Sequence, residues 1–477
     1  MGGIGPAALS TSSTTSSRSI ADLPEAGALR TPVHRGDTRS LSWRLTQLDR
    51  LSTLLRQHGP AVLEALADDL GKPTLEASFE LVAVRQEIAL TRRHLRRWMA
   101  PRPIPLDLAL QPGQAWVERQ PLGCVLIIGP WNYPFQLSLH PLVSALAAGN
   151  TAVVKPSEHA PRTAELIADL LHHAFPADVV RVVLGDAGVA GELLEQRFDH
   201  VFFTGGSRVG SLVMQACARH LTPVTLELGG KSPVIVLADT DVATTARRLA
   251  WGKGLNAGQT CIGPDHLLVE SAVRDALVQA MAAELARFYG PDPLRSPDLG
   301  RIVNDAQFQR LEQLLAGARQ RGQVLVGGRS DAAERRIEPT LLAVASPDDP
   351  LMQEELFGPL LPVLTTAGLE EALEQIRQGP HPLALYLFSR SRQAQRRVLE
   401  ASSSGGVVFN DVVLQGGAAA LPFGGVGPSG MGSYHGEAGF RTFSHERSVL
   451  RRPFQLDLPF RYPPYAGKLP LVKWLLG

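Results

Sequence analysis

Apolar residues recur at helical spacing from about residue 37 to residue 100. An amphipathic helix repeats its buried positions every three to four residues, so this spacing predicts a helical region. Pro101, Pro103 and Pro105 end the region, because proline lacks a backbone donor and breaks helices. The leucines that carry the pattern are Leu48, Leu51, Leu54, Leu55, Leu63, Leu66 and Leu70.

A regular alternation of short apolar runs and helical patterns follows. Apolar runs of this length are typical of buried strands, and their alternation with helices predicts βαβ units in a doubly wound parallel sheet. One of the intervening helices is expected to follow Pro141. Such sheets bind ligands outside the carboxyl ends of their strands, so the polar residues there are candidates for binding. The five runs are residues 124–129, 151–155, 179–185, 200–205 and 223–230.

A second α/β region follows the first. Its expected strands again alternate with helical stretches, and Cys261 lies in a loop near its start. A glycine-rich segment over 416–432 and a polar strand over 443–452 come last. The strands expected in this region are residues 232–239, 266–270, 359–364, 383–388 and 405–411.

Composition narrows the classes of function. The chain of 477 residues has 47 Lys and Arg against 46 Asp and Glu, so no basic face is expected and we predict no nucleic-acid partner. The chain has three cysteines, Cys124, Cys217 and Cys261. A small and odd number of cysteines argues against a framework of disulfide bonds and favours a reducing compartment, the cytoplasm. We also expect no metal site, because no cysteine pair or histidine cluster has ligand spacing.

The two ends of the chain differ in composition from the rest. Residues 1–25 are rich in Ser, Thr, Gly and Ala, have no continuous apolar run, and are expected to form a disordered tail. The last residues, "AGKLPLVKWLLG", are apolar but too short to span a bilayer. We expect this segment to pack on the protein, with weak contact to a membrane surface as the alternative.

Two features at predicted strand ends point to anion or ribose binding. The turn from Gly205 to Gly210, in "FTGGSRVG", joins a strand to a helix and would aim helix N-terminal amides at a pyrophosphate. Its spacing is not the usual dinucleotide motif, and glycines at such turns also occur for steric reasons alone. Lys155 and Glu158, in "VVKPSEHAP", could meet a ribose or phosphate, or could be surface charges at a helix start.

Three residues are candidates for catalysis. Glu227 follows an apolar strand, where partial burial would raise its pKa toward that of a general base; a solvated loop residue is the alternative. Asn132, in "GPWNYPF", is a candidate oxyanion donor or an ordinary turn residue. Cys261, in "NAGQTCIGPD", is a candidate nucleophile or buried filler, whereas Cys124 and Cys217 are expected to be filler.

Seven stretches in a fixed order make the chain resemble the aldehyde dehydrogenase superfamily over about residues 37 to 465. The "QTC" and "PD" around the cysteine, the "MGSYHG" run and "RYPPY" resemble the class 3 branch, which includes fatty-aldehyde and coniferyl-aldehyde dehydrogenases. The seven stretches are "GPWNYPF", "KPSE", "FTGGSRVG", "ELGGKSP", "NAGQTCIGPD", "EELFGP" and "LPFGGVGPSGMGSYHGEAGFRTFS".

The resemblance implies a role for each matching residue. Cys261 would attack the aldehyde, Asn132 and the backbone N–H of Cys261 would hold the oxyanion, and Glu227 would activate the water that hydrolyses the thioester. Lys155 and Glu158 would meet the adenosine ribose, and Glu355 the nicotinamide ribose. The cofactor, NAD or NADP, would lie against Trp131, Lys155, Glu158, Phe203, Gly205, Gly206, Val209, Gly210, Glu355 and Phe357.

The resemblance also implies a domain plan. A Rossmann-like NAD(P)-binding domain would span residues 26–228, with oligomerisation strands near 106–122, and an α/β catalytic domain would span 229–432. An oligomerisation strand and a C-terminal tail would occupy 433–477.

Three positions depart from the residues that the family usually has in these motifs. Gly206 replaces a Ser or Asn and so removes one phosphate contact, while Gly263 and His266 are expected to change the pocket beside Cys261.

The expected activity is the oxidation of a medium- or long-chain aliphatic or an aromatic aldehyde to its acid. An acylating dehydrogenase that transfers the acyl group to coenzyme A is one alternative, and Glu227 argues against it. A thioesterase-like hydrolase without redox chemistry is opposed by Lys155, Glu158 and Glu355. A structural relative without activity could have lost Cys261, which is present. The polar strand at 443–452 resembles the family's oligomerisation strand, and this resemblance implies a homodimer rather than a tetramer. Glu158 would disfavour the 2′-phosphate of NADP.

Overall fold

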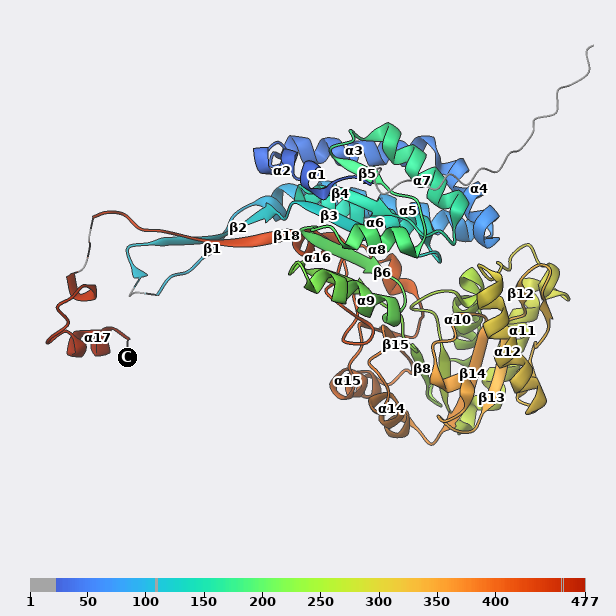
Figure 1. Ribbon diagram of the computed structural model, residues 1–477. Coiled ribbons are helices and arrows are strands. Elements are labelled where there is room, and N and C mark those ends of the chain that lie inside the picture. The colour runs from blue at the N-terminus through green and yellow to red at the C-terminus, as the bar shows by residue number, and fades with distance from the viewer. Residues whose placement is uncertain (1–22, 108–109, 456, 458, 477) are drawn as a thin grey trace, which may run out of the picture.

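The computed structural model describes residues 23–107, 110–455, 457 and 459–476. It has two α/β lobes, each built around its own sheet, and a narrow arm that projects from the first lobe (Figure 1). The predicted fold class, a doubly wound sheet with a second α/β domain and a small β extension, is confirmed by this arrangement.

Helices form the first part of the first lobe, as the leucine spacing predicted. Buried leucines of these helices pack with the sheet and with α6 in one core. Most of residues 1–25, the predicted tail, lie outside the described residues; Leu23, however, packs against the sheet core, and Glu25 is the N-cap of α1. The helices are α1 (Ala26–Leu29), α2 (Thr31–Arg35), α3 (Leu41–Gln57), α4 (Gly59–Leu70) and α5 (Thr74–Met99).

The first sheet has the strand order β17-β7-β6-β3-β4-β5, and all its pairs are parallel except that of β17 with β7. The chain runs from β3 outward to β5 and then returns to the other side of β3. This reversal between β3 and β6 is the switch point at which doubly wound sheets bind ligands. The strands are β3 (Cys124–Ile128), β4 (Thr151–Lys155), β5 (Val180–Val182), β6 (His200–Thr204), β7 (Val224–Glu227) and β17 (Gly430–Met431).

The helices of this lobe cover both faces of the sheet, and one of them corrects a prediction. The helix expected after Pro141 is α6 (Pro134–Ala148), which begins seven residues earlier and contains Pro141. Pro134 suits the first turn, where the backbone N–H has no helical partner, and the packing of the whole buried helix tolerates the second proline. The other helices are α7 (Pro161–Ala174), α8 (Ala187–Leu194), α9 (Ser207–Ala218) and α16 (Gly436–Thr442).

The second lobe is a seven-stranded sheet of order β10-β13-β14-β9-β8-β15-β16, in which only the edge strand β10 runs antiparallel to its neighbour. The five strands predicted for this region are present, whereas β10 and β13 had no counterpart in the prediction. The strands are β8 (Pro233–Val236), β9 (His266–Glu270), β10 (Val324–Val326), β13 (Thr340–Val344), β14 (Leu360–Thr366), β15 (Ala384–Phe388) and β16 (Gly406–Phe409).

Helices pack on both faces of the second sheet, and a small β-ribbon lies beside it. The helices are α10 (Val242–Gly254), α11 (Ser271–Tyr289), α12 (Asp305–Gln320), α13 (Pro350–Gln353), α14 (Leu369–Gln378) and α15 (Arg392–Ala401), with short 3₁₀ turns η3 (Leu255–Gly258), η4 (Pro293–Arg295) and η5 (Leu414–Gly417). The ribbon strands are β11 (Ser330–Asp331) and β12 (Arg336–Ile337).

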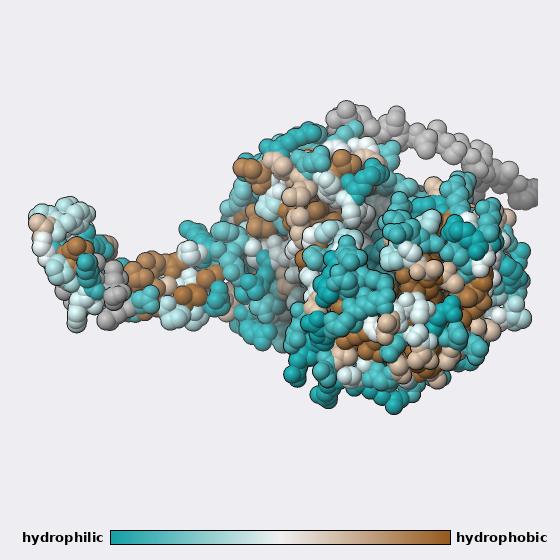
Figure 2. All heavy atoms as spheres, turned by 90° about the horizontal axis from the view of Figure 1, so that it is seen from below, coloured by the Kyte–Doolittle hydropathy of each residue, from teal (hydrophilic) through white to brown (hydrophobic). Residues whose placement is uncertain are grey.

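The arm is a three-stranded antiparallel sheet, β1 (Arg102–Ile104), β2 (Gln114–Pro121) and β18 (Ser444–Arg451). It contains the polar strand predicted at 443–452 and stands away from both lobes in two orthogonal views (Figures 1 and 2). The arm leads to η6 (Pro459–Arg461) and α17 (Leu469–Leu476), so the predicted packing of the C-terminal tail on the body is wrong. Within the described residues, no helix is long and apolar enough to cross a membrane.

The chain crosses between the lobes twice. It leaves the first sheet after β7 and enters the second at β8, and it returns when Gly430 pairs with Glu227. The return falls two residues before the predicted boundary at 432, and α16 then packs on α5 and α6 of the first lobe. The carboxyl end of β7 therefore faces the amino end of β8, and the catalytic candidates lie around this crossing.

Candidate active site

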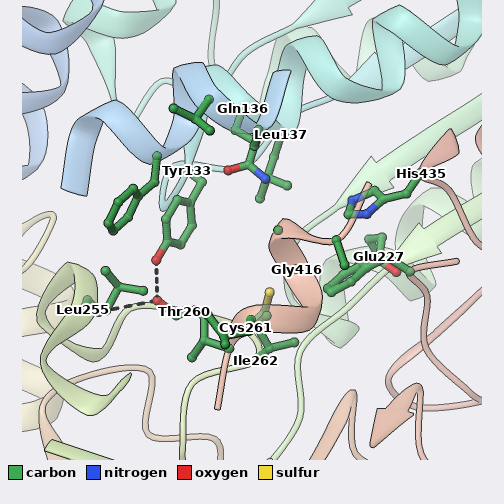
Figure 3. A pocket seen from close by; sticks show the side chains of 18 of the residues that line it. Tyr133, Gln136, Leu137, Glu227, Leu255, Thr260, Cys261, Ile262, Gly416 and His435 are labelled. Atoms are coloured by element: carbon green, nitrogen blue, oxygen red, sulfur yellow. Dashed lines mark hydrogen bonds between the residues drawn. The ribbon is translucent and has the colours of Figure 1, made fainter. Parts of the chain in front are cut away.

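A cavity of about 470 Å³ lies where the two lobes meet. The first lobe supplies α5, the start of α6 and the end of β7, and the second supplies the cysteine loop and the 413–418 segment. Figure 3 shows the thiol of Cys261 at the lower centre of this cavity and Glu227 to its right, with Gln136 above them and Tyr133 to the left. The cavity is mostly apolar, and its apolar side chains include Phe79, Val82, Leu137, Trp251, Leu255, Ile262, Val413, Leu414 and Phe423.

The loop before Cys261 has an unusual backbone. Asn256 and Ala257 both lie in the left-handed region, with φ of 52°, and Gly258 follows with φ of 75°. A Cβ at Gly258 would meet the carbonyl group of Gly358, so glycine is needed there for space as well as for conformation. Gln259 anchors the loop, since its side chain accepts from the Val303 N–H at 2.9 Å. This strained conformation holds Cys261 at the cavity wall.

Cys261 is a neutral thiol in this arrangement. Burial raises its pKa well above the usual range, and the carboxyl groups of Glu227 and Glu355 add to the effect, while the backbone N–H groups of Ile262 and Cys261 oppose it. Cys261 is nevertheless partly exposed to the cavity, whereas Cys124 and Cys217 are buried in the core of the first lobe. A nucleophilic role for Cys261 thus needs a base within the cavity.

Glu227 is the candidate for such a base. It ends β7, is 2% exposed, and its Oε1 has no hydrogen-bond partner among the described residues. Burial raises the pKa of this carboxyl group well above its ordinary value of 4.5, which makes its carboxylate form a stronger base. The strand fixes its position, because the Glu227 carbonyl accepts from the Gly205 N–H at 2.9 Å and the residue pairs with Gly430.

Asn132 lies behind the cavity wall, at 4% exposure, next to Tyr133. Its Nδ2 donates to the Gln259 carbonyl at 3.2 Å, which ties it to the cysteine loop two residues before Cys261. An amide nitrogen carries two N–H donors, and this bond uses one of them. The Tyr133 hydroxyl and Thr260 Oγ1 lie 2.7 Å apart and connect the same two segments a second time.

The candidates for cofactor binding gather at the carboxyl edge of the first sheet. Lys155 ends β4, is 3% exposed, and pairs with Glu158 at 2.7 Å. Gly206 is the N-cap of α9 and makes no side-chain cap, so the first amides of this helix are available to an anion. A Cβ at Gly205 would collide with Phe203, and one at Gly210 with Leu228. These residues therefore fit a pyrophosphate and a ribose at the switch point.

A second group of candidates comes from both lobes. The Glu355 carboxyl group lies against Gly229, where a Cβ would collide with it. Burial and the nearby Asp265 raise the pKa of Glu355 to about 8. Phe357 and Trp131 meet edge to face, with ring centroids 5.2 Å apart. Val209 on α9 is exposed, at 39%. The fold thus brings Trp131 against Phe357, which follows Glu355 by two residues and is far from Trp131 in the sequence.

Part of the cavity wall differs from the prediction. Gly263 and His266 were expected to shape the pocket, but they do not line it: Gly263 closes a turn onto Thr260, and His266 lies buried on β9. Tyr133, Thr260 and His435 line the cavity and were not predicted. The quoted motifs contain all three, yet nothing in their spacing shows that they converge. In the described part of the chain, no group of three or more His, Cys, Asp or Glu could hold a metal ion.

The fold and the site define a two-lobed α/β oxidoreductase with a nucleotide edge on one sheet and a cysteine loop from the other lobe. Residues 33–449 match the aldehyde dehydrogenase family, and the chain belongs to that family. It is 47% identical to human aldehyde dehydrogenase family 3 member B1 over 443 residues, covering 92% of this chain and 94% of the relative.

Two further similarities come from Staphylococcus aureus. The chain is 44% identical to its 4,4′-diaponeurosporen-aldehyde dehydrogenase over 437 residues, covering 91% of this chain and 95% of the relative. The substrate-bound structure of its AldH superposes with a TM-score of 0.92 at 42% identity, covering 94% of this chain and 98% of that chain. The protein is thus an oxidoreductase that acts on aldehydes with a nicotinamide cofactor and resembles the class 3 branch, as predicted.

Proposed function

We propose that Cys261 is the nucleophile that attacks the aldehyde carbon, with Glu227 as the base of the site. The observation that carries this proposal is that both side chains line the same cavity. The thiol proton passes to the Glu227 carboxylate, and the sulfur forms a thiohemiacetal. The new oxyanion is held by the second N–H of Asn132 and by the backbone N–H of Cys261.

Oxidation follows from that adduct. A nicotinamide bound at the edge of the first sheet would supply the acceptor for the hydride that the adduct loses, and Cys261 would then carry the acyl group as a thioester. Glu227, once deprotonated again, takes a proton from water, whose oxygen attacks the thioester and releases the acid. Hydrolysis of the thioester is favoured over transfer of the acyl group to coenzyme A. The Glu227 carboxyl group lines the cavity with a raised pKa and with Oε1 unpartnered among the described residues, so it can activate water, whereas attack by a thiol would not need such a base.

The cofactor is proposed to lie across the carboxyl edge of the first sheet. The N-terminus of α9, with Gly205, Gly206 and Gly210, would face the pyrophosphate, and Lys155 with Glu158 the adenosine ribose. Glu355 would hold the nicotinamide ribose between Trp131 and Phe357, and Phe203 and Val209 would line the same edge. Glu158 favours NAD, because a 2′-phosphate would lie against a carboxylate.

The substrate is proposed to be a medium- or long-chain aliphatic or an aromatic aldehyde. The apolar lining of the cavity supports this class, since burying apolar surface provides most of the binding energy there. A relative named for an aldehyde, 4,4′-diaponeurosporen-aldehyde dehydrogenase, agrees with an apolar substrate. Cytoplasmic location, in line with three free cysteines, stays a prediction.

We propose a homodimer in which the arm contacts a second copy. The outer strand β18 presents an unpaired edge, and Leu450 on it is 53% exposed. Figure 2 shows apolar side chains along the projecting arm, away from any other part of the chain. An exposed strand edge with apolar side chains is a surface that proteins normally cover. The tail beyond it, with Trp474 79% exposed, could instead contact a membrane surface weakly.

The test is a screen of aldehydes of increasing chain length and aromaticity with NAD and with NADP, in which the formation of NADH or NADPH is measured. We expect kcat/KM to rise with apolar chain length and the acid to be the product. Formation of an acyl-coenzyme A in preference to the acid, when coenzyme A is supplied, would refute the hydrolytic role of Glu227. Loss of NADH formation in Cys261→Ser, with cofactor binding retained, would support the nucleophile.

A further inference from the structure

A buried ion pair lies directly beneath the turn that carries Asn132. Lys72, between α4 and α5, and Glu80, on the second turn of α5, have fully buried side chains, and Lys72 Nζ lies 2.5 Å from Glu80 Oε1. Neither residue lines the cavity. Removing two charges from water is costly, so a pair of this kind persists where its remaining donors and acceptors are satisfied by other groups.

The Lys72 ammonium group also contacts the Asn132–Tyr133 turn. Its Nζ donates to the Asn132 carbonyl at 2.8 Å and lies 3.9 Å from the centroid of the Tyr133 ring. The same carbonyl accepts from Asn256 Nδ2 at 2.8 Å. Lys72 and the cysteine loop therefore both bind the backbone carbonyl oxygen of Asn132, whose side chain is the proposed oxyanion donor.

Glu80 holds the other end of the turn. Its Oε2 accepts from the Phe135 N–H at 3.1 Å and from the Gln136 N–H at 2.9 Å. These are first-turn amides of α6, whose N-cap, Tyr133, makes no side-chain cap. A carboxylate at a helix N-terminus satisfies amides that have no helical partner and interacts favourably with the helix dipole. Glu80 therefore caps α6 from another helix and fixes where the helix begins.

The two residues thus fix both ends of the five-residue segment 132–136. The Asn132 side chain then reaches the Gln259 carbonyl, and the Tyr133 hydroxyl reaches Thr260, so the turn is set against the segment that carries Cys261. A shift of the turn would move the free N–H of Asn132 relative to the sulfur without removing any group that touches the substrate. Catalysis by an oriented donor is sensitive to displacements of about 1 Å.

We propose that Lys72 and Glu80 are positioning residues that hold the Asn132–Tyr133 turn in register with the Cys261 loop, and so set the rate at which the thiohemiacetal forms. The inference rests on the proposed roles of Asn132 and Cys261. It assigns a catalytic consequence to two residues that neither contact the cavity nor belong to the motifs that define the family resemblance.

The experiment measures the rate of the first turnover in the full-length enzyme, as the burst of NADH at saturating aldehyde and NAD. Lys72→Met removes the charge at similar length, and Glu80→Gln removes one charge at constant size. We expect each to slow the burst by about 10- to 100-fold. The rate of Cys261 alkylation by iodoacetamide, followed by mass spectrometry, should stay unchanged, since alkylation needs the thiol but no oxyanion donor.

Two matched controls separate positioning from a general loss of stability. Arg44 is buried and donates to the Ala147 carbonyl at 3.1 Å, at the far end of the same helix α6. Asp69 caps α7 from another helix, accepting from the Thr163 N–H at 2.8 Å, as Glu80 caps α6. Arg44→Met and Asp69→Asn should lower the Tm and leave the burst rate unchanged. A burst slowed as much in these controls would overturn the proposal.

A double-mutant comparison identifies the path of the effect. If Lys72 acts through Asn132, Lys72→Met adds no further slowing to Asn132→Ala. An equal fold-loss in both backgrounds, or a parallel loss of Cys261 alkylation, would overturn the positioning role and leave the role of Asn132 intact. A normal burst in Asn132→Ala alone would instead overturn the oxyanion assignment, and the inference with it. If Lys72→Met does not fold, Glu80→Gln provides the same comparison.

Discussion

Replacing Glu227 by glutamine removes the ionisable group of the proposed base and keeps the size of the side chain. The group is 2% exposed with one oxygen unpartnered, so the rest of the cavity wall should stay in place. General-base catalysis contributes about 10²- to 10⁴-fold, and hydrolysis of the thioester should slow by that factor. Glu227 is also the proposed acceptor of the thiol proton before hydride transfer, so the burst of one equivalent of NADH per active site should slow as well.

The same substitution should have an effect of known sign on stability. Burial raises the pKa of Glu227 above 4.5, so the folded protein keeps a proton that the unfolded chain releases as the pH rises past that value. Wild-type stability therefore falls with rising pH until the raised pKa is reached, by about 1.4 kcal/mol for each pKa unit of the shift. The glutamine variant lacks this loss, and its Tm relative to wild type should increase with pH.

The assay is stopped-flow NADH absorbance with a long-chain aldehyde across a pH series, with thermal unfolding on the same samples. Wild-type turnover, where hydrolysis limits it, should rise with pH as Glu227 ionises, and the residual turnover of the variant should be independent of this group. A burst that keeps its wild-type rate would show that Glu227 does not accept the thiol proton and acts in hydrolysis alone. A steady-state rate within a factor of two of wild type would refute its role as the base.

The remaining predictions concern the nucleophile, the loop, the cofactor and the arm. Cys261→Ser should abolish NADH formation with unchanged NAD binding by fluorescence titration, and residual turnover would contradict the proposed nucleophile. Gly258→Ala should cost about 1–3 kcal/mol in chemical unfolding, because of its positive φ and the nearby Gly358 carbonyl. Glu158→Gln should lower KM for NADP more than for NAD; equal changes would exclude like-charge repulsion. Leu450→Asp should give a monomer in light scattering, and an unchanged mass would remove the arm from the interface.

The alternation of apolar runs determined much of the fold in advance. Each strand of the first sheet from 124–129 to 223–230 formed where it was expected, because a strand buried on both faces must be apolar throughout. The positions of Lys155 and Gly205 at strand ends followed from the same pattern. The start of α6 did not, because Pro141 resembles a first-turn proline and the group that caps Pro134–Ala148 is Glu80, 54 residues before Pro134.

The site shows the same division. The sequence by itself singled out Cys261, Glu227 and Asn132, since their residue types at strand ends and in glycine-bounded loops suit acyl chemistry. Only the tertiary structure decided that Cys261 and Glu227 share a cavity and that Lys72 lies beneath Asn132. The pattern of apolar and polar residues within a segment indicates which face of that segment is buried, and this pattern is set by residues that are neighbours in the chain. The contacts of a buried charge depend on which distant segments pack around it, and no local pattern records them.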